Sequence, residues 1–439
     1  VSARPCAVPA PAAVAEPLPP GRGHHHGIFE LDETAPRMAH RRFDRQAHPC
    51  REGELGIVAG VGKARLRHQS RGFMGHEPHA VDDEMRVRLV RGRGDERQRR
   101  VGDVAPPRAV ADRPARRLLH LLDEAEKIDQ FLRQNDGFLC GEDLAAFHPE
   151  WVDPIGVNYR GYDVWEIPPN GQGIVALMAL NILKGFEFSE QASVETYHRQ
   201  IEAIKLAFAD GMHMVTERKD MRYTVEAMLS DEYGAERRQL IGEEALLPTP
   251  GTPPQGGTVY LATADGEGNM VSYIQSNYQG FGSGVVVPGT GIALQNRGHN
   301  FSLDPEHVNA LAPGKRTYHT IIPGFLTKGK EAVGPFGVMG GFMQPQGHLQ
   351  VVMNTIDFGL NPQAALDAPR WQWTRDKVVL VEPGFPDHLA QALARKGHQV
   401  QRTLQSGSFG RGEIIWRDSK TGVLVAGTEP RTDGQVAAW

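Results

Sequence analysis

This sequence has few cysteines, no long apolar runs and only a small net charge. The three cysteines, Cys6, Cys50 and Cys140, are far apart, so there is neither the paired spacing of a zinc site nor a disulfide framework. This pattern favours a reducing compartment, and we expect a cytoplasmic protein. No stretch approaches the roughly 18 apolar residues of a membrane span, so we expect no membrane partner. A net charge of −5 over 439 residues gives no reason to expect nucleic acid as a partner.

Residues 1–122 differ in composition from the rest of the chain. Arginine is abundant up to about residue 120, whereas Lys63 is the single lysine there, and proline, glycine and histidine are frequent. No sustained helical or strand period is present. One interpretation is a disordered or loosely packed basic arm. The other is that the segment is not read in its native coding frame, because arginine without lysine, together with alanine, glycine and proline, is what GC-rich DNA encodes out of frame.

From Asp123 onward the apolar pattern is regular, first helical and then extended. It predicts helices over 123–137, 174–186, 197–215 and 224–241, and a strand over 162–168. An exposed linker is expected over 242–257. The pattern after it predicts strands over 258–264 and 270–276, a hairpin over 283–294, strands over 320–326 and 331–341, helices over 347–359 and 386–396, and short strands near Ile414 and Val423. Helices on both sides of a run of strands predict layered α and β structure with a largely antiparallel sheet.

The linker ends in Gly256-Gly257 and runs directly into Thr258 at the start of a strand. A threonine hydroxyl is a weak nucleophile that needs a base close by. If the chain is cut between Gly257 and Thr258, the new α-amine, with an unperturbed pKa of roughly 7.7–8.0, is such a base on the same residue. The spacing alone also fits an ordinary threonine at the beginning of a strand.

Three collinear segments resemble the gamma-glutamyltransferase family of self-cleaving amide hydrolases, whose nucleophile is the first residue of the small subunit. Residues 258–301, with "DGEGN", "FGSG" and "PGTGI" in order, resemble the start of that subunit. Residues 137–186 resemble the end of the large subunit, and residues 340–371 resemble a later part of the small one. The resemblance covers residues 123–439, and residues 1–122 match nothing in it.

The resemblance implies roles for four residues. It places Thr258 on the nucleophile and Ser276 on a hydroxyl residue that orients it. It places Gly340 and Gly341 on the glycine pair whose backbone N–H groups form the oxyanion hole, a task that needs close backbone approach and no side chain. Taken without the family, Ser276 is an ordinary strand residue and the two glycines form an ordinary turn.

The substrate-binding positions depart from those of true gamma-glutamyl enzymes, which hold an α-ammonium group and an α-carboxylate. Arg297 and Asn300 stand where the family contacts the ammonium group, and His319 and Thr320 stand where it has a serine pair. A cation and a neutral amide are poor partners for an ammonium group, so the site is expected to take a substrate with a carboxylate and no amine. His319 also fits an ordinary buried histidine.

Within the family, these motifs most resemble the oxamate amidohydrolase-like branch, whose members hydrolyse a small α-keto-acid amide. Tyr278 and Gln344 are expected to line the same pocket. The resemblance implies no metal ion and no organic cofactor. A genuine gamma-glutamyl transferase or glutathione hydrolase is the alternative within the family. An inactive remnant is the other alternative, because the family's large subunit normally supplies more chain before residue 123, including a substrate-binding arginine.

The sequence as a whole predicts an α+β protein, a four-layer αββα sandwich of the N-terminal-nucleophile hydrolase type. One precursor is expected to give a large subunit whose C-terminal part is 123–257 and a small subunit, 258–439, which stay associated. Residues 1–122 are left unassigned. The expected ligand is a small-molecule amide, and a homodimer of these two-subunit molecules is an assembly that the sequence allows.

Overall fold

The structure is a computed structural model that describes residues 56–61, 113–248 and 258–439. Within these ranges, side chains are described from Asp123 onward. Every described residue belongs to the unit formed by residues 54–439. The predictions for Gly257 and for most of residues 1–122 therefore lie outside the described residues.

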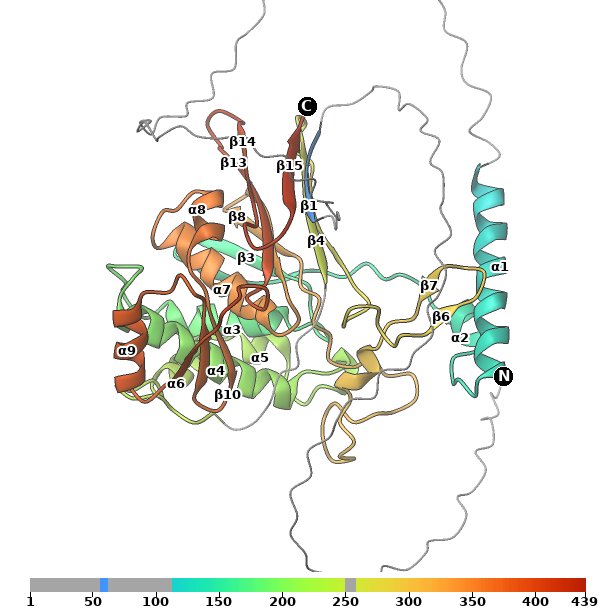
Figure 1. Cartoon of the computed structure of the whole chain (residues 1–439), viewed down its shortest axis with the longest axis horizontal. Coiled ribbons are helices and arrows are strands. Elements are labelled where there is room, and N and C mark those ends of the chain that lie inside the picture. Colours follow the sequence, from blue (N-terminus) through green and yellow to red (C-terminus); the bar gives the residue numbers. More distant parts are fainter. Residues whose placement is uncertain (1–55, 62–112, 249–257) are drawn as a thin grey trace, which may run out of the picture. The chain divides into compact units, whose positions relative to one another are not determined.

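Most helices form where the sequence has a helical apolar period. Two short helices, near residues 141 and 362, are absent from the predicted elements, and two predicted helices differ in their bounds. α1 begins at Arg113 rather than at Asp123. The single helix predicted over 224–241 is wrong, because the Ser230 hydroxyl accepts a hydrogen bond from the Tyr233 N–H at 3.1 Å and so caps a new helix. The helices are α1 Arg113–Gln134, α2 Gly141–Ala146, α3 Gly173–Leu183, α4 Val194–Met214, α5 Val225–Met228, α6 Asp231–Arg238, α7 Met343–Ile356, α8 Pro362–Asp367 and α9 Asp387–Arg395, with 3-10 turns η1 Arg218–Asp220 and η2 Arg297–Asn300 (Figure 1).

The strands after the linker follow the predicted order. The strands near residues 56, 155, 371, 378, 399 and 434 are absent from the predicted elements. The first of them lies in the segment for which no strand period was expected. The strands are β1 Gly56–Val61, β2 Ile155–Tyr159, β3 Tyr162–Glu166, β4 Val259–Asp265, β5 Met270–Gln275, β6 Val286–Val287, β7 Ile292–Ala293, β8 Gly324–Lys328, β9 Glu331–Met339, β10 Trp371–Arg375, β11 Val378–Val381, β12 Gln399–Arg402, β13 Arg411–Arg417, β14 Leu424–Thr428 and β15 Gly434–Ala438.

Two sheets dominate the fold. The larger has six strands in the order β14-β13-β9-β8-β3-β2, and the smaller has four in the order β15-β1-β4-β5. Neighbouring strands are antiparallel in both sheets, which confirms the predicted largely antiparallel pairing. The remaining described strands form a sheet in the order β10-β11-β12, in which β11 and β12 are parallel, and the β6-β7 hairpin.

The two large sheets pack face to face. Tyr260 and Ala262 on β4 share one buried apolar cluster with Met339 on β9 and Ile415 on β13. The contact is close, since a Cβ atom on Gly337 would lie 2.4 Å from the Tyr260 ring. Glycine at position 337 therefore allows the tyrosine to reach the backbone of the six-stranded sheet.

Helices cover the opposite face of the six-stranded sheet. The His348 ring of α7 packs against Phe336 of β9, with 5.0 Å between the ring centroids. A Cβ atom on Gly347 of α7 would lie 2.5 Å from Val338 of β9. α3 and α4 pack against α7 and against each other (Figure 1). This helical layer carries the main apolar core on its sheet-facing side.

The outer face of the four-stranded sheet carries exposed apolar side chains. Val271 and Tyr273, which lie on the same side of β5, are 50% and 44% exposed. The described residues thus form a helical layer and two sheet layers, which is the mixed α and β structure that the sequence predicts. The fourth, helical layer of the αββα sandwich stays a prediction.

The turn before α3 is held tightly against the six-stranded sheet. Every residue of α3 is buried, because the helix packs between β2, β3 and α4, and its apolar composition on all sides is typical of an enclosed helix. A Cβ atom on Gly173 would lie 2.6 Å from the Glu166 side chain of β3. This close approach fixes the position of the residues just before α3.

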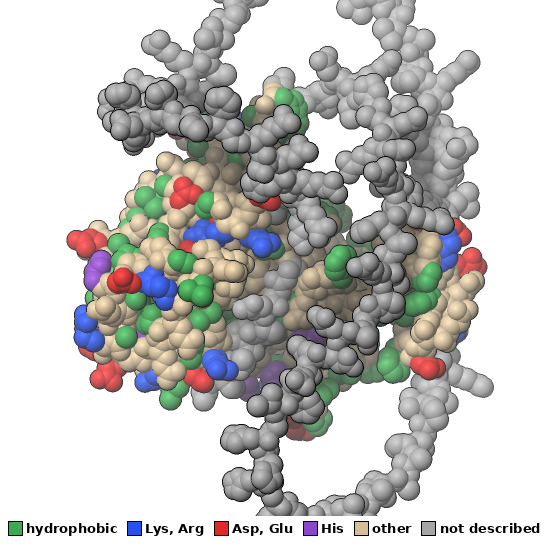
Figure 2. Space-filling model, in the orientation of Figure 1, with side chains coloured by type: hydrophobic (Ala, Val, Ile, Leu, Met, Phe, Trp, Pro, Cys, Tyr) green, Lys and Arg blue, Asp and Glu red, His purple; other side chains and the backbone are tan. Residues whose placement is uncertain are grey.

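On the face shown in Figure 2, acidic and basic side chains are interspersed with apolar and neutral ones. The described residues visible on that face therefore form no extended basic surface. Among the described helices, none combines the length and the apolar character that crossing a membrane requires.

Candidate active site

Thr258 immediately precedes β4 and is 6% exposed. Val259 pairs with Gln275 at this end of the β4–β5 ladder, so the next pair in the same register is Thr258 and Ser276. The Thr258 hydroxyl oxygen is buried and makes no hydrogen bond with the described residues. An unpaired buried hydroxyl costs about 1–3 kcal/mol, and such a group calls for a functional explanation.

The start of β4 lies at one identifiable end of the two-sheet sandwich. Tyr260, near that start, lies over Gly337, which pairs with Glu413 near the start of β13. At the other end of β4, a Cβ atom on Gly268 would lie 3.3 Å from the guanidinium of Arg417, the last residue of β13. β4 and β13 therefore run in the same direction (Figure 1). Because β9 is antiparallel to β13, the last residues of β9 lie at the same end of the sandwich as the first residues of β4 and β13.

Gly340 and Gly341 follow β9 at this end of the sandwich. Their φ angles of 145° and 60° are values that favour glycine. Their carbonyl groups accept hydrogen bonds from the N–H groups of Met343 at 3.0 Å and Gln344 at 3.2 Å, where α7 begins. Neither glycine N–H donates a hydrogen bond to a described residue. Both N–H groups are thus available as donors, which an oxyanion hole requires.

Arg297 supplies the charge of the site. It is 5% exposed, and no carboxylate of the described residues forms an ion pair with it. Its guanidinium donates to the Thr320 hydroxyl at 2.7 Å and to the Ser276 hydroxyl. Burial lowers its pKa to about 10, so the group stays charged at neutral pH. A buried cation without a counter-ion is costly and favours an anionic ligand.

Ser276 and Tyr278 lie against this guanidinium on the loop after β5. The Ser276 oxygen accepts from Arg297 and from the Tyr278 N–H, the latter at 3.1 Å, so the serine proton is free to be donated. The Arg297 guanidinium lies 5.3 Å from the centroid of the Tyr278 ring, within cation–π range. Tyr278 has a φ of 77°, a strained value for a bulky residue and one that is found at functional sites.

His319 is a neutral hydrogen-bond donor beside Thr320. Burial, followed by the charges of Arg297 and Arg316, lowers its pKa to about 3. Its Nδ1 atom accepts the Ile321 N–H at 3.2 Å, which leaves the single ring proton on Nε2. At neutral pH the ring therefore offers an N–H group and no charge.

Asn300 and Gln344 differ in what their amides can offer. The Asn300 amide nitrogen donates to the Tyr318 carbonyl at 3.0 Å, so it holds the loop in place. Gln344 is fully buried, and its side-chain oxygen accepts the Ile322 N–H at 3.3 Å. Its amide nitrogen has no partner among the described residues. Gln344 thus has a free donor.

Gln172, which is not among the predicted site residues, joins the two halves of the site. Its amide nitrogen donates to the carbonyl groups of Thr320 and Gly341, both at 2.8 Å. The residue is completely buried in the turn before α3. It therefore ties the threonine that binds Arg297 to the glycine pair. The signal in the sequence was a polar residue directly before an all-apolar helix, which does not identify its partners.

The structure brings most of the predicted residues to one place. Asn300 is turned to the Tyr318 carbonyl. Hydrogen bonds, chain adjacency and strand register connect the others, which are Thr258, Ser276, Tyr278, Arg297, His319, Thr320, Gly340 and Gly341. Their individual roles stay predictions.

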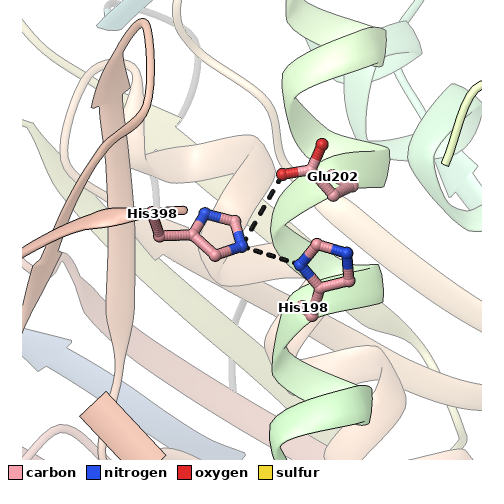
Figure 3. A group of neighbouring side chains, drawn as sticks. All are labelled: His198, Glu202 and His398. Carbon is pink, nitrogen blue, oxygen red and sulfur yellow. Dashed lines mark hydrogen bonds and ion pairs between the residues drawn. The ribbon is translucent and has the colours of Figure 1, made fainter. Parts of the chain in front are cut away.

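A second buried polar cluster joins α4 to the residue before β12 (Figure 3). Ligand-type atoms of His198, Glu202 and His398 lie within 4.8 Å of one another, a grouping that can hold a metal ion. The His198 Nδ1 and His398 Nε2 atoms are 2.8 Å apart, at hydrogen-bonding distance. The Lys205 ammonium lies 2.7 Å from the Glu202 oxygen that faces His398, and it already supplies the cation. We therefore interpret the cluster as a hydrogen-bonded network.

This network holds residues 242–246, the first part of the segment predicted to be an exposed linker; Ala245 is buried there, so the prediction is wrong for this residue. The His198 Nε2–H group donates to the Gly242 carbonyl at 3.0 Å, which leaves Nδ1 to accept a hydrogen bond from the His398 Nε2–H group. The Glu202 carboxylate accepts the Leu246 N–H at 3.0 Å. Both ends of this segment are thus fastened to α4.

Lowering the pH is expected to destabilise the fold through His398. Burial, followed by the charge of Lys205, lowers its pKa to about 2, far below the roughly 6.5 of an unfolded histidine. As the pH falls, this histidine is therefore protonated in the unfolded chain at a higher pH than in the folded chain. The stabilisation is complete above pH 6.5 and is lost as the pH falls, by about 1 kcal/mol per pH unit for this one group.

Urea unfolding at pH 7.5 and pH 5.5 measures this loss. His398→Gln should weaken the pH dependence by about this amount because one buried histidine is gone, while His319, whose pKa is also lowered, still contributes. His388→Gln, at an exposed position of α9, is the matched control and should leave the pH dependence unchanged. A His398→Gln variant with the pH dependence of the unmutated chain would contradict the assignment.

Comparison with known proteins finds one family. The family model for gamma-glutamyltranspeptidase matches residues 123–439. The glutathione hydrolase-like YwrD proenzyme of Bacillus subtilis is 38% identical over 320 residues, with 71% of this chain and 61% of that protein covered. The oxamate amidohydrolase proenzyme of Klebsiella pneumoniae is 33% identical over 303 residues, with 68% and 57% covered. The chain thus spans less than two thirds of the length of these relatives.

A solved structure shares this arrangement of helices and sheets. A cephalosporin acylase from Bacillus halodurans is 72% identical and has a TM-score of 0.70, with 72% of this chain and 58% of that one covered. The names of the three relatives denote different substrates. The comparisons therefore support a family rather than one substrate.

Proposed function

Because the chain belongs to the gamma-glutamyltranspeptidase family, we propose that it is a precursor that cuts itself between Gly257 and Thr258 and then hydrolyses a small amide. The proenzyme names of its relatives support a precursor. In this proposal, residues 123–257 belong to a large subunit and residues 258–439 form the small one. The complete fold is then the four-layer αββα sandwich.

Thr258 is proposed to act as the nucleophile, with its own α-amine as the base. The amine takes the hydroxyl proton while Oγ1 attacks the amide carbonyl, and the N–H groups of Gly340 and Gly341 hold the oxyanion. The protonated amine then gives its proton to the leaving nitrogen as the C–N bond breaks, which leaves an acyl ester. Water attacks this ester, and the amine again transfers the proton. The unpartnered Thr258 hydroxyl supports this role.

The substrate is proposed to carry a carboxylate close to the scissile amide and no amine. The observation that carries this proposal is the buried Arg297 guanidinium, which has no carboxylate partner among the described residues. Its hydrogen bonds to Ser276 and Thr320 fix its position, and the neutral His319 adds a second donor. An ammonium group on the substrate would meet a like charge here. An oxamate-like amide fits these constraints.

The two subunits are proposed to stay together after the cut. The Ala245 N–H donates to the Lys396 carbonyl at 2.6 Å, and the Lys396 ammonium lies 3.0 Å from the Glu243 carboxylate. Residues of both parts, such as Leu177 and Leu349, also share the main apolar core. These contacts join residues before the proposed cut to residues after it, and the cut does not break them.

Ammonia release from oxamate, measured beside the hydrolysis of a gamma-glutamyl anilide, tests the proposed substrate. We expect kcat/KM to be about 100-fold or more higher for oxamate, because the anilide brings an ammonium group to the Arg297 side of the site. A preference for the anilide would support a gamma-glutamyl transferase or glutathione hydrolase. Activity toward neither, without a fragment beginning at Thr258 in the mass spectrum, would support an inactive remnant.

A further inference from the structure

Arg411 is a second arginine at the end of the sandwich that holds Thr258. It begins β13 and pairs with Met339, the last residue of β9. Paired residues of antiparallel strands point to the same face of a sheet, and Met339 belongs to the cluster between the two sheets. The Arg411 side chain therefore enters the layer between the sheets, at the end where β4 begins with Thr258.

The chain next to Arg411 touches the predicted oxyanion hole. A Cβ atom on Gly340 would lie 3.1 Å from the Cα atom of Gly410, the residue just before Arg411. Gln172 ties the neighbouring Gly341 to Thr320, the residue that binds Arg297. The glycine pair is thus connected by short contacts to the surroundings of both arginines.

Arg411 has no partner among the described residues. The residue as a whole is partly exposed, but its Nε atom is buried without a hydrogen-bond partner, and its guanidinium forms no ion pair or side-chain hydrogen bond with the described residues. The acid on the same face of β13 is Glu413, which accepts a hydrogen bond from the Thr428 hydroxyl at 3.1 Å. Burial and the charge of Glu429 raise the pKa of Glu413 to about 8, so it supplies little negative charge at neutral pH.

Structural arginines in this part of the fold are paired. The Arg370 guanidinium lies 2.9 Å from the Glu429 carboxylate, and the Arg431 guanidinium lies 2.5 Å from that of Glu382. A buried guanidinium nitrogen without an acceptor carries a desolvation cost, and the fold avoids that cost at positions 370 and 431. Position 411 differs from both, because its buried Nε atom has no acceptor among the described residues.

We propose that Arg411 forms a second anion subsite, so that the substrates of this site are amides with a carboxylate on each side of the scissile bond. Arg297 takes the carboxylate of the acyl part, and Arg411 takes the carboxylate of the leaving amine. The substrate class is that of N-acylated amino acids whose acyl group is itself a small dicarboxylic acid. This inference rests on the proposed function and narrows it.

N-oxalylglycine and oxamate are the matched pair of substrates that tests the subsite. Both contain the same oxalyl carboxylate, and only N-oxalylglycine has a second carboxylate on the leaving side. We expect Arg411→Gln to lower kcat/KM for N-oxalylglycine by about 10- to 100-fold, the loss of one charge-assisted hydrogen-bonded contact. The loss should be at least tenfold smaller for oxamate. Arg411→Lys should recover part of the loss.

Arg375→Gln, at the exposed end of β10, is the matched control and should leave kcat/KM unchanged for both substrates. An equal loss for both substrates in Arg411→Gln would show that Arg411 shapes the glycine pair, and no loss would show that it binds nothing. Either result overturns the subsite.

A calorimetric titration separates this proposal from the proposed function. If the full chain hydrolyses neither compound, the proposed function fails, and the subsite is judged by binding alone. Tighter binding of N-oxalylglycine than of oxamate, lost in Arg411→Gln, would still support the subsite. Equal binding of the two compounds would overturn it.

Discussion

Replacing Thr258 with alanine is expected to leave a single uncut polypeptide of 48.3 kDa and to lower amide hydrolysis by at least about 10⁴-fold. The proposed cut needs the Thr258 hydroxyl to attack the Gly257 carbonyl. The later hydrolysis needs the same hydroxyl and the amine that the cut releases. One substitution therefore removes both steps. A denaturing gel shows the uncut band, and a mass spectrum of the unmutated chain should show a fragment that begins at Thr258.

Two variants control this experiment. Thr258→Ser keeps a hydroxyl and should still be cut. Thr263→Ala makes the same chemical change further along β4, on the face opposite to that of Tyr260 and Ala262, and should be cut as the unmutated chain is. If Thr258→Ala still separates into two fragments, another residue is the nucleophile.

Local sequence signals predicted the elements near the site well. The Asp265 carboxylate accepts the Glu267 and Asn269 N–H groups at 3.0 and 2.9 Å, which is the short-range turn chemistry that the Gly- and Asn-rich hairpin predicts. The apolar run over 174–186 likewise predicted α3 from neighbouring residues alone. Such signals depend on residues a few positions apart, so a single sequence is enough to show them.

Contacts between distant segments could not be predicted in the same way. Gln172 lies 148 and 169 residues from its partners Thr320 and Gly341, and no local pattern connects these positions. Gly410 and Gly340, which are also in contact, lie in two segments that no local pattern connects. The resemblance to a family supplied the list of site residues, but the hydrogen bonds that position them come from the fold.

The break between α5 and α6 shows a further limit. The apolar period continues across residues 224–241, and it predicted one helix. Ser230 interrupts that helix because its side chain competes with the backbone for the Tyr233 N–H. A serine inside a helical period fits both outcomes, and packing against Asn181 of α3, whose amide donates to the Leu229 and Ser230 carbonyls, favours the break.

Replacing Arg297 with glutamine is expected to lower kcat/KM for oxamate by about 100- to 1,000-fold, mainly through a higher KM. Removing one member of a buried, hydrogen-bonded charge pair costs about 2–5 kcal/mol, and the carboxylate of the substrate is the proposed partner of this guanidinium. Glutamine keeps hydrogen-bond donors for Ser276 and Thr320, so the variant removes the charge with little change in packing. Arg297→Lys keeps the charge but has one point-like donor group in place of the planar fork. It should recover only part of the activity.

A neutral competitor distinguishes binding by Arg297 from a purely structural role. Oxamide has the same α-keto amide as oxamate and no carboxylate. The unmutated chain should therefore prefer oxamate strongly, and Arg297→Gln should reduce the ratio of the two kcat/KM values toward one. The cut before Thr258 involves no substrate carboxylate, so the variant should still yield the fragment that begins there. A variant that is no longer cut, or whose kcat/KM falls by the same factor for both substrates, would show that Arg297 positions Ser276 and Thr258 instead of binding the carboxylate.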